Sequence, residues 1–317
     1  MLTRRELLPL LAAVPWPRPS APETLPPVKR TRIVFGGDVM LSRYVGRLAR
    51  AQHDPSSPLR DLAAFLAAAD IAFVNLESPF SDRGAVVDRG MRFKAEPEMI
   101  AALERAGIDV VSTANNHARD CSGHGVEFTL DWLERHGIAA AGTGRSAEAA
   151  HRGAVLTRNG MRFGFLAYTF DQSNGNHPDV DARVALLHAV TMRRDVADLR
   201  RRADVVVVSM HAGVEYAPQP NRRQIDFARA AIDAGARVVA GSHPHVVQPS
   251  ERCNDGVIFY SLGNLVFDQF QRSATQHGAL GEVVFEGASI AQASLTAVRI
   301  VQTVPRLASE SGSHPAG

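Results

Sequence analysis

The sequence predicts an α/β fold built around a largely buried, mixed β-sheet. Apolar, β-rich runs alternate with amphipathic helical segments along most of the 317 residues. Strands as apolar as these are typical of a sheet that helices cover. Asn159-Gly160 lies between two β-rich runs, and this pair is typical of a tight hairpin, so the sheet also contains an antiparallel strand. The composition, with 45% hydrophobic and 21% charged residues, is that of an ordinary globular chain.

Apolar runs are expected to form the strands of this sheet. They are rich in β-branched, aromatic and small residues, and segments of polar or helical character separate them. No internal repeat or low-complexity linker divides them, so one domain is expected. The runs span residues 32–40, 71–77, 108–115, 162–170, 203–213, 236–245 and 256–264.

Amphipathic segments between these runs are expected to form helices. Gly107, Gly137 and Gly235 each close one of them, as expected for a residue that tolerates the left-handed conformation of a helix C-terminal cap. The segments span residues 58–70, 96–107, 125–137, 190–202 and 221–235.

The two ends of the chain have a different character. Residues 1–30 contain Arg4 and Arg5, a short apolar run over 7–14 and a Pro-rich stretch, which together resemble a twin-arginine export signal and a linker. Export to the periplasm or cell envelope is therefore expected; the alternative is an arginine-containing tail with no targeting role. The apolar run is too short to span a bilayer, so no stable transmembrane anchor is expected. Residues 31–305 then form the domain, and 306–317 form a polar, disordered tail.

The net charge limits the classes of binding partner, and the cysteine content limits the possible disulfides. The net charge is +2 and Lys/Arg runs are absent, so neither a nucleic acid nor a membrane surface is expected as a partner. Cys121 and Cys253 are the only cysteines. They are candidates for a disulfide in an oxidising compartment, but their spacing does not decide whether they pair.

Polar side chains follow five of the predicted strands where each strand ends. A single such residue is usually a turn or helix cap, but ligands of an α/β sheet bind beyond the carboxyl ends of its parallel strands. Five strand ends with ligand chemistry therefore predict a site. The residues are Asp38; Asn75 and Glu77; Asn115, Asn116 and His117; His211 and Glu215; and His243 and His245.

The residue types favour metal chemistry. The chain has no G-x-S-x-G nucleophile motif and no Gly-rich phosphate loop ending in Lys. Carboxylate, amide oxygen and imidazole together suit divalent Mn, Fe, Co or Zn. His243 and His245 project from alternate positions of one extended segment, so they would serve one metal ion each or share one.

The motifs resemble those of a known family. "GGDVML", "NLESP", "ANNHARD", "HAGVEY", "GSHPHVVQ" and "IFYSLGNLVFDQ" occur in the order and spacing of the CapA/PgsA-like capsule and poly-γ-glutamate synthesis proteins. That family is in turn similar to the calcineurin-like metallophosphoesterases. The resemblance covers residues 32–269 and implies a four-layer α/β/β/α sandwich with two mixed sheets and the site at one edge.

The resemblance implies a ligand set for one or two divalent ions. Asp38 resembles the first metal-binding aspartate, and Glu77 stands where a carboxylate bridges two metals. One ion would be held by Glu77, Asn116, His211 and His243, and the other by Asp38, Glu77 and His245.

The resemblance also implies catalytic residues, and the loops beside the site suggest substrate contacts. His117 matches the imidazole that protonates a leaving group. Asp120 is expected to orient that ring, and its alternative role is that of a helix N-cap. Plausible substrate contacts, each with a solvated loop residue as the alternative, are Glu215, Tyr216, Asn176 and Arg222.

Two residues depart from the metallophosphoesterase pattern. Met40 stands where that superfamily has a histidine, and a thioether is a poor ligand for Mn or Zn beside carboxylates. One ion should therefore bind more weakly than the other. Glu77 replaces the usual bridging aspartate and reaches one methylene further. Both departures put simple phosphoester hydrolysis in doubt.

The expected function is that of a metal-dependent hydrolase in the metabolism of capsule, poly-γ-glutamate or another cell-envelope polymer. A metal-bound water would attack a phosphoester or γ-glutamyl amide in an anionic polymer or peptide substrate, while His117 acts as general acid. One alternative is a non-hydrolytic accessory protein of polymer synthesis or export, with other polymer-synthesis proteins as partners. Another is a metal-dependent peptide epimerase. His117 favours an enzyme, because a structural metal site would not need it.

Overall fold

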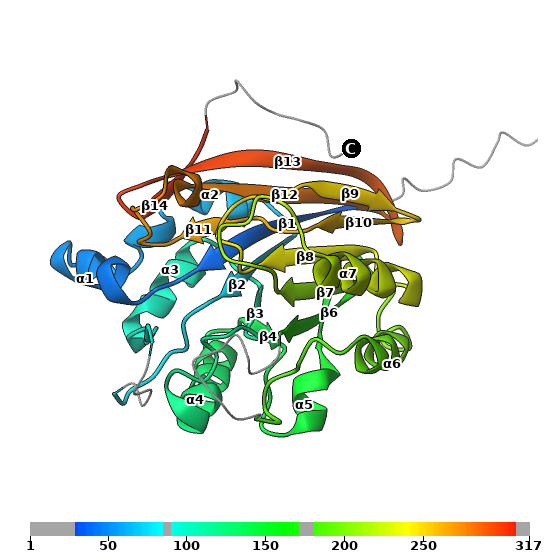
Figure 1. Cartoon of the computed structure of the whole chain (residues 1–317), viewed down its shortest axis with the longest axis horizontal. Helices are drawn as coiled ribbons and strands as arrows, with labels where there is room; N and C mark the ends of the chain where they lie inside the picture. The colour runs from blue at the N-terminus through cyan, green and yellow to red at the C-terminus, as the bar shows by residue number, and fades with distance from the viewer. Residues whose placement is uncertain (1–28, 85–89, 171–180, 309–317) are drawn as a thin grey trace, which may run out of the picture.

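Two β-sheets pack face to face and helices cover both outer faces (Figure 1). This arrangement is seen in a computed structural model that describes residues 29–84, 90–170 and 181–308. The four layers confirm the predicted α/β/β/α sandwich with two mixed sheets.

The first sheet has a parallel part and an antiparallel part. β1 (Arg30–Val39), β2 (Ile71–Leu76), β3 (Val110–Ser112) and β4 (Ala139–Ala141) are parallel neighbours in that order. The short strand β11 (Asn264–Val266) also pairs in parallel with β1. On its other side β1 is joined by the antiparallel strands β12 (His277–Glu286), β13 (Ser289–Val301) and β14 (Val304–Leu307).

The second sheet has a parallel centre with antiparallel edges. Its order is β5 (Ala154–Arg158), β6 (Met161–Thr169), β7 (Val205–His211), β8 (Val238–Ser242), β10 (Gly256–Phe259) and β9 (Ser250–Cys253). β5 and β6 form the predicted hairpin. Asn159 and Gly160 at its turn both have positive φ, 53° and 84°, as a two-residue type I′ turn requires.

The helices lie on the outer faces of the two sheets. Gly107, Gly137 and Gly235 have positive φ after α3, α4 and α7, which confirms the predicted C-terminal caps. The helix expected over 58–70 is instead a 3₁₀ turn, Ser57–Leu59, followed by the short α2. The helices are α1 (Arg43–Ala51), α2 (Ala63–Ala67), α3 (Ile100–Arg105), α4 (Ser122–Arg135), α5 (Ala147–Arg152), α6 (Ala189–Leu199) and α7 (Arg222–Ala234); further 3₁₀ turns are Pro97–Met99 and Ser273–Gln276.

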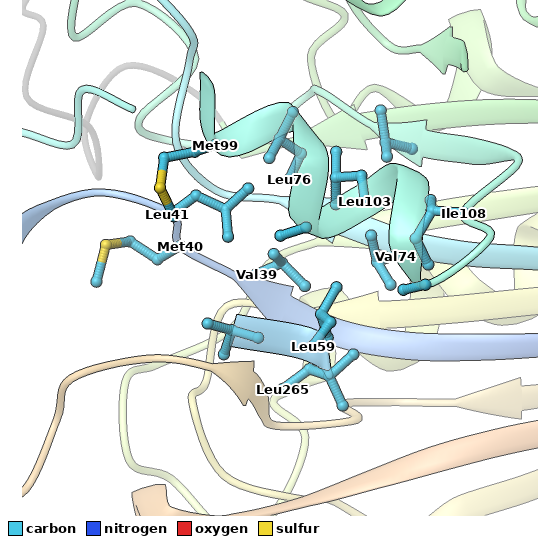
Figure 2. Packing of buried hydrophobic residues seen from close by; sticks show 14 of the residues in the cluster. Val39, Met40, Leu41, Leu59, Val74, Leu76, Met99, Leu103, Ile108 and Leu265 are labelled. Atoms are coloured by element: carbon cyan, nitrogen blue, oxygen red, sulfur yellow. The ribbon is translucent and has the colours of Figure 1, made fainter. Parts of the chain in front are cut away.

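Three apolar layers hold the sandwich together. Between the sheets, Phe73 of β2 stacks on Phe165 of β6 with ring centroids 5.9 Å apart. Burying an aromatic side chain of this size contributes about 1.5–3 kcal/mol. Figure 2 shows part of the second layer, in which Val39 and Val74 of the first sheet pack near Leu103 of α3. The third layer lies between the second sheet and α6 and α7.

Several expectations concern the ends and the cysteines. The predicted export signal falls on residues 1–28, outside the described residues, as does the tail from 309 onward. β14 continues to Leu307, two residues beyond the predicted end of the domain. Cys121 and Cys253 are free thiols in the structure. Of the helices described, none is long and apolar enough to cross a bilayer.

Candidate metal centre

The strand ends of both sheets meet at one cluster. The first sheet supplies Asp38 near the end of β1, Glu77 directly after β2, and Asn116 after β3. The second sheet supplies His211 at the end of β7 and, just after β8, the pair His243 and His245. Apart from Asn116, which is half-buried, each of these side chains is buried. The interface between the two sheets therefore opens, at this edge, onto a polar cluster.

One group of donors combines Glu77, His211 and His243, whose ligand atoms all lie within 4.8 Å of one another. His211 Nε2 lies 3.8 Å from Glu77 Oε1 and 2.8 Å from Asn116 Oδ1. Asn116 therefore adds an amide oxygen on the same side. These four residues are the set that the sequence assigned to one ion.

A second group combines Asp38, Glu77 and His245, with ligand atoms again within 4.8 Å of one another. His245 Nδ1 lies 3.4 Å from Asp38 Oδ2, and its Nε2 lies 4.0 Å from Glu77 Oε1. Glu77 belongs to both groups, as expected of a bridging carboxylate. Each group has three such residues, and Asn116 lies beside the first group, so two sites of unequal affinity stay a prediction.

Glu77 has the environment of a ligand without its cation. The side chain is fully buried, and neither carboxylate oxygen has a hydrogen-bond partner among the described residues. Burial, reinforced by the nearby Asp38 carboxylate, raises the pKa of Glu77 well above its ordinary value. A buried carboxylate that lacks hydrogen bonds is costly unless a positive charge neutralises it. The donor set therefore fits a divalent cation.

Two of the histidines, His211 and His243, are held in the neutral form that a metal requires. Burial, together with the neighbouring imidazoles, lowers the pKa of His211 well below its ordinary value. Burial lowers the pKa of His243 to about 3. Within the described part of the chain, His243 Nδ1 has no hydrogen-bond partner. A neutral imidazole with an unpaired nitrogen has a lone pair available for a metal ion.

The backbone that carries the two last histidines is strained. His243 and His245 have φ of 96° and 58°, in the left-handed region that non-glycine residues rarely adopt. Each such residue costs on the order of 1–3 kcal/mol, and such strain clusters at functional sites. The His243 amide donates to Asp38 Oδ2 at 3.2 Å, which ties the loop of the second sheet to the first.

His117 lies beside the cluster and is oriented from two directions. Its Nδ1 lies 2.7 Å from Asp120 Oδ2, which also accepts the Phe93 amide at 2.7 Å. The Phe93 ring stacks on the imidazole with centroids 3.7 Å apart. His117 Nε2 lies 4.0 Å from Glu77 Oε1, so this nitrogen faces the cluster. The N-cap position of α4 is occupied by Cys121, so Asp120 contacts His117 and does not cap the helix.

Further polar residues form hydrogen bonds with the proposed ligands and fix their orientation. Asn75 Nδ2 donates to Asp38 Oδ1 at 2.8 Å, and Ser242 Oγ lies 2.9 Å from His211 Nδ1. Asn264 Oδ1 lies 2.9 Å from His245 Nδ1. Such partners fix the ring orientation of metal-binding histidines. Sequence reasoning gave no role to Ser242 or Asn264, although Asn264 ends the "IFYSLGN" run and so had the same strand-end signal as the ligands.

Of the four candidate substrate contacts, the structure brings Tyr216 and Glu215 near the cluster and places Arg222 on the surface of α7. Tyr216 is half-buried with its ring 6.2 Å from that of His245, and exposed Glu215 precedes it. Burial, together with Glu215, raises the pKa of Tyr216. Arg222 lies on the exposed surface of α7, where it pairs with Asp226 at 2.8 Å. Asn176 lies outside the described residues.

Met40 does not offer its sulfur to a metal. The side chain is fully buried in the layer shown in Figure 2. Its sulfur accepts hydrogen bonds from the Ser42 hydroxyl at 3.1 Å and the Ser42 amide at 3.3 Å. Met40, which stands where the metallophosphoesterase pattern has a histidine, therefore packs in the core and is not a metal ligand.

Proteins of known structure share the fold of this chain. Solved structures with the same fold include a hypothetical protein from Thermus thermophilus (TM-score 0.54, 19% identity, covering 84% of this chain and 98% of that one). A 5'-nucleotidase precursor from the same organism matches with a TM-score of 0.51 and 14% identity, covering 88% of this chain and 54% of the other. This chain shares the fold of these two proteins.

The chain belongs to the bacterial capsule synthesis protein family PGA_cap, whose model matches residues 32–269. It is 32% identical to the "PGA biosynthesis protein CapA" of Bacillus subtilis over 74% of its own length and 63% of the relative's. It is 30% identical to the "Capsule biosynthesis protein CapA" of Bacillus anthracis, covering 83% of this chain and 68% of that protein. A Mycobacterium tuberculosis relative, 30% identical over 63% of this chain and 56% of its own, is described as a "Probable polyglutamine synthesis accessory protein". The chain thus spans about two thirds of its two Bacillus relatives.

Proposed function

We propose that this chain is a metal-dependent hydrolase that cleaves γ-glutamyl amide bonds in a cell-envelope polymer. The observation that carries the proposal is His117, a histidine oriented by Asp120 whose Nε2 faces Glu77 of the metal-ligand cluster. A metal that served only stability would need ligands but no oriented acid beside them. The relatives described as a "PGA biosynthesis protein" and a "Probable polyglutamine synthesis accessory protein" support a glutamyl polymer as the substrate.

Six residues would hold the metal, and they divide into the two groups described above. A divalent ion bound there supplies Lewis-acid polarisation and lowers the pKa of a water molecule. Manganese, zinc, iron and cobalt all suit this mixture of carboxylate, amide and imidazole donors. The proposed ligands are Asp38, Glu77, Asn116, His211, His243 and His245.

His117 would act as the general acid that protonates the leaving group. Asp120 accepts a hydrogen bond from Nδ1, which fixes the ring and leaves the Nε2 end to hold the proton that is transferred. In amide hydrolysis the hydroxyl of water joins the carbonyl carbon and the C–N bond breaks. The proton from His117 goes to the leaving nitrogen, and the remaining proton of the water restores His117. An amine is a poor leaving group without that proton, so this role matters most for amide substrates.

His117→Ala tests the assignment. The variant should keep its metal content and fold but lose about 10²–10⁴ in turnover of γ-glutamyl oligomers, the usual contribution of a positioned acid. The loss should be smaller on aryl phosphates with good leaving groups. His136→Ala is the matched control, because its Nδ1 pairs with Glu104 at 2.8 Å at the end of α4, outside the cluster.

Two outcomes would contradict the proposal. Unchanged turnover by His117→Ala on substrates with poor leaving groups would exclude the acid role. A metal-loaded wild type with no activity on γ-glutamyl amides or phosphoesters would instead favour a non-hydrolytic accessory protein. The mycobacterial relative is described as such an accessory protein.

A further inference from the structure

Arg272 is an exposed cation near the metal-ligand cluster. It follows β11 and directly precedes the 3₁₀ turn Ser273–Gln276. Its guanidinium carbon lies 4.6 Å from the centroid of the Tyr216 ring, in a cation–π contact. Among the described residues, no carboxylate pairs with Arg272, and its side chain faces solvent. The planar face of the guanidinium is therefore occupied, while its N–H groups remain available to a ligand.

The ring beneath Arg272 is fixed beside the cluster. The Tyr216 amide donates to the carbonyl of Pro244, which lies between His243 and His245, at 2.8 Å. Tyr216 has a φ of 66°, a conformation that is strained for a non-glycine residue. Since its ring lies 6.2 Å from that of His245, one aromatic ring separates Arg272 from a proposed metal ligand.

The segment that carries Arg272 is attached to the same ligand by a second route. Asn264, which contacts His245, donates from Nδ2 to Gln269 Oε1 at 3.1 Å. Gln269 in turn donates from Nε2 to the Tyr216 hydroxyl at 3.4 Å. These contacts anchor the segment that carries Arg272 before a ligand arrives, which reduces the conformational entropy that this segment loses on binding.

Two other arginines near this edge are already paired: Arg119, whose Nε lies 3.2 Å from Asp181 Oδ2, and Arg43. Arg43 lies 5.4 Å from the centroid of the Phe93 ring, which itself stacks on His117. However, its Nη2 lies 3.3 Å from Oδ1 of the buried Asp268, so its charge is balanced within the protein. Glu215 is close enough to Tyr216 to raise the pKa of its hydroxyl, but within the described part of the chain it forms no ion pair with Arg272. Arg272 is therefore an exposed cation that no carboxylate neutralises among the described residues, and a substrate can use it.

We propose that Arg272 is a specificity-determining residue that binds a carboxylate of the substrate next to the bond that is cleaved. This inference rests on the proposed function. Each residue of a γ-linked glutamate chain keeps a free α-carboxylate close to its amide bond. A guanidinium binds a carboxylate with two parallel hydrogen bonds, so it sets orientation as well as affinity. Held one ring away from His245, Arg272 selects a chain of carboxylates over a neutral peptide.

Binding to full-length, Mn²⁺-loaded protein tests this inference without requiring turnover. The probes are a γ-glutamyl hexamer and the same hexamer with its side carboxylates converted to amides, both measured by calorimetry. We expect the wild type to prefer the acidic hexamer, and Arg272→Gln to weaken its binding by about 10–100-fold, the usual range for a charge-assisted hydrogen bond. Binding of the neutral hexamer should stay the same, and Arg272→Lys should restore part of the loss.

The matched control is Arg201→Gln, which removes an exposed arginine just after α6 that pairs with Asp198. It should bind both hexamers as the wild type does. Equal binding of the acidic hexamer by wild type and Arg272→Gln would overturn the inference, as would no binding by the wild type. Arg272-dependent binding of a glycerol phosphate oligomer in place of the γ-glutamyl hexamer would overturn the assignment to a carboxylate.

Different results would contradict the hydrolase proposal and the proposed role of Arg272. If the wild type binds the acidic hexamer through Arg272 but hydrolyses nothing, the hydrolase proposal is wrong and the role of Arg272 stands. If the wild type hydrolyses the hexamer and Arg272→Gln leaves KM unchanged, the role of Arg272 is wrong and the hydrolase proposal stands.

Discussion

At the strand ends, the sequence predicts which residue types form the site but not all of the contacts that support them. Carboxylate, amide and imidazole groups at five strand ends predicted a metal site, and the family resemblance implied which six of these residues are ligands. The sequence did not predict that Ser42 engages the Met40 sulfur, or that Asn264 supports His245. Those contacts join side chains whose distance depends on the folded loops, and no local pattern encodes that distance.

The buried histidines predict how the metal-free protein responds to acid. His211 and His243 have lowered pKa values in the fold, so the unfolded chain binds more protons between those values and about 6.5. Their contribution to stability is therefore complete above pH 6.5 and is lost as the pH falls, by up to about 1.4 kcal/mol per pH unit for each group. Glu77 acts in the opposite direction, because its raised pKa favours the protonated form.

Comparison with His243→Gln isolates the contribution of one histidine. The free energy of unfolding would be measured with urea in the presence of chelator at pH 7 and pH 5. The wild type should lose more stability than the variant between these values, since only the wild type keeps the imidazole of His243 neutral in the fold. Equal losses would show that this imidazole is not held neutral.

Elements of secondary structure were predictable where their pattern is local. The Asn159-Gly160 hairpin and the glycine caps after α3, α4 and α7 follow from residues that tolerate positive φ. The segment over 58–70 was predicted as one helix because its apolar spacing is helical. In the structure, Leu59, Leu62 and Leu66 all reach the core, but a 3₁₀ turn and the short α2 share the segment.

Gly241 in β8 shows how an element positions the site. A Cβ at this residue would lie 2.0 Å from the Tyr260 carbonyl oxygen, which follows β10. Gly241→Ala should therefore force the backbone apart two residues before His243, lower the free energy of unfolding by about 1–3 kcal/mol and reduce metal affinity.

The matched control for that variant is Gly84→Ala, because a Cβ at Gly84 meets nothing within 4 Å. Thermal unfolding and metal titration of both variants would test the prediction. A Gly241→Ala protein as stable as the Gly84→Ala protein would show that the close approach of β8 to Tyr260 is not required.

At the scale of the whole molecule, the site joins two sheets. The sequence predicted the strands but could not divide them between sheets, because strands buried on both faces look alike in either layer. It also did not predict β12, β13 and β14. β12 pairs antiparallel with β1, from which it is far apart in the chain, and β13 and β14 extend the sheet from β12. Donors from β1, β2 and β3 meet donors from β7 and β8 only because the two sheets are stacked with their strand ends at one edge.

A bound ion would therefore connect the two sheets of the sandwich. Binding to the native state alone raises the free energy of unfolding, by about 2.7 kcal/mol when the metal concentration is about one hundred times Kd. Loss of metal should lower the melting temperature of the protein as a whole, since residues from both layers lose a shared partner.

Elemental analysis of full-length protein, purified without chelator, tests the central claim most directly. We predict at least one equivalent of a divalent metal in the wild type, a rise in melting temperature when metal is returned to chelator-treated protein, and a sharp loss of metal in His243→Ala but not in His136→Ala. Less than stoichiometric metal in the wild type, with no thermal shift on adding Mn²⁺, Zn²⁺, Co²⁺ or Fe²⁺, would contradict the account.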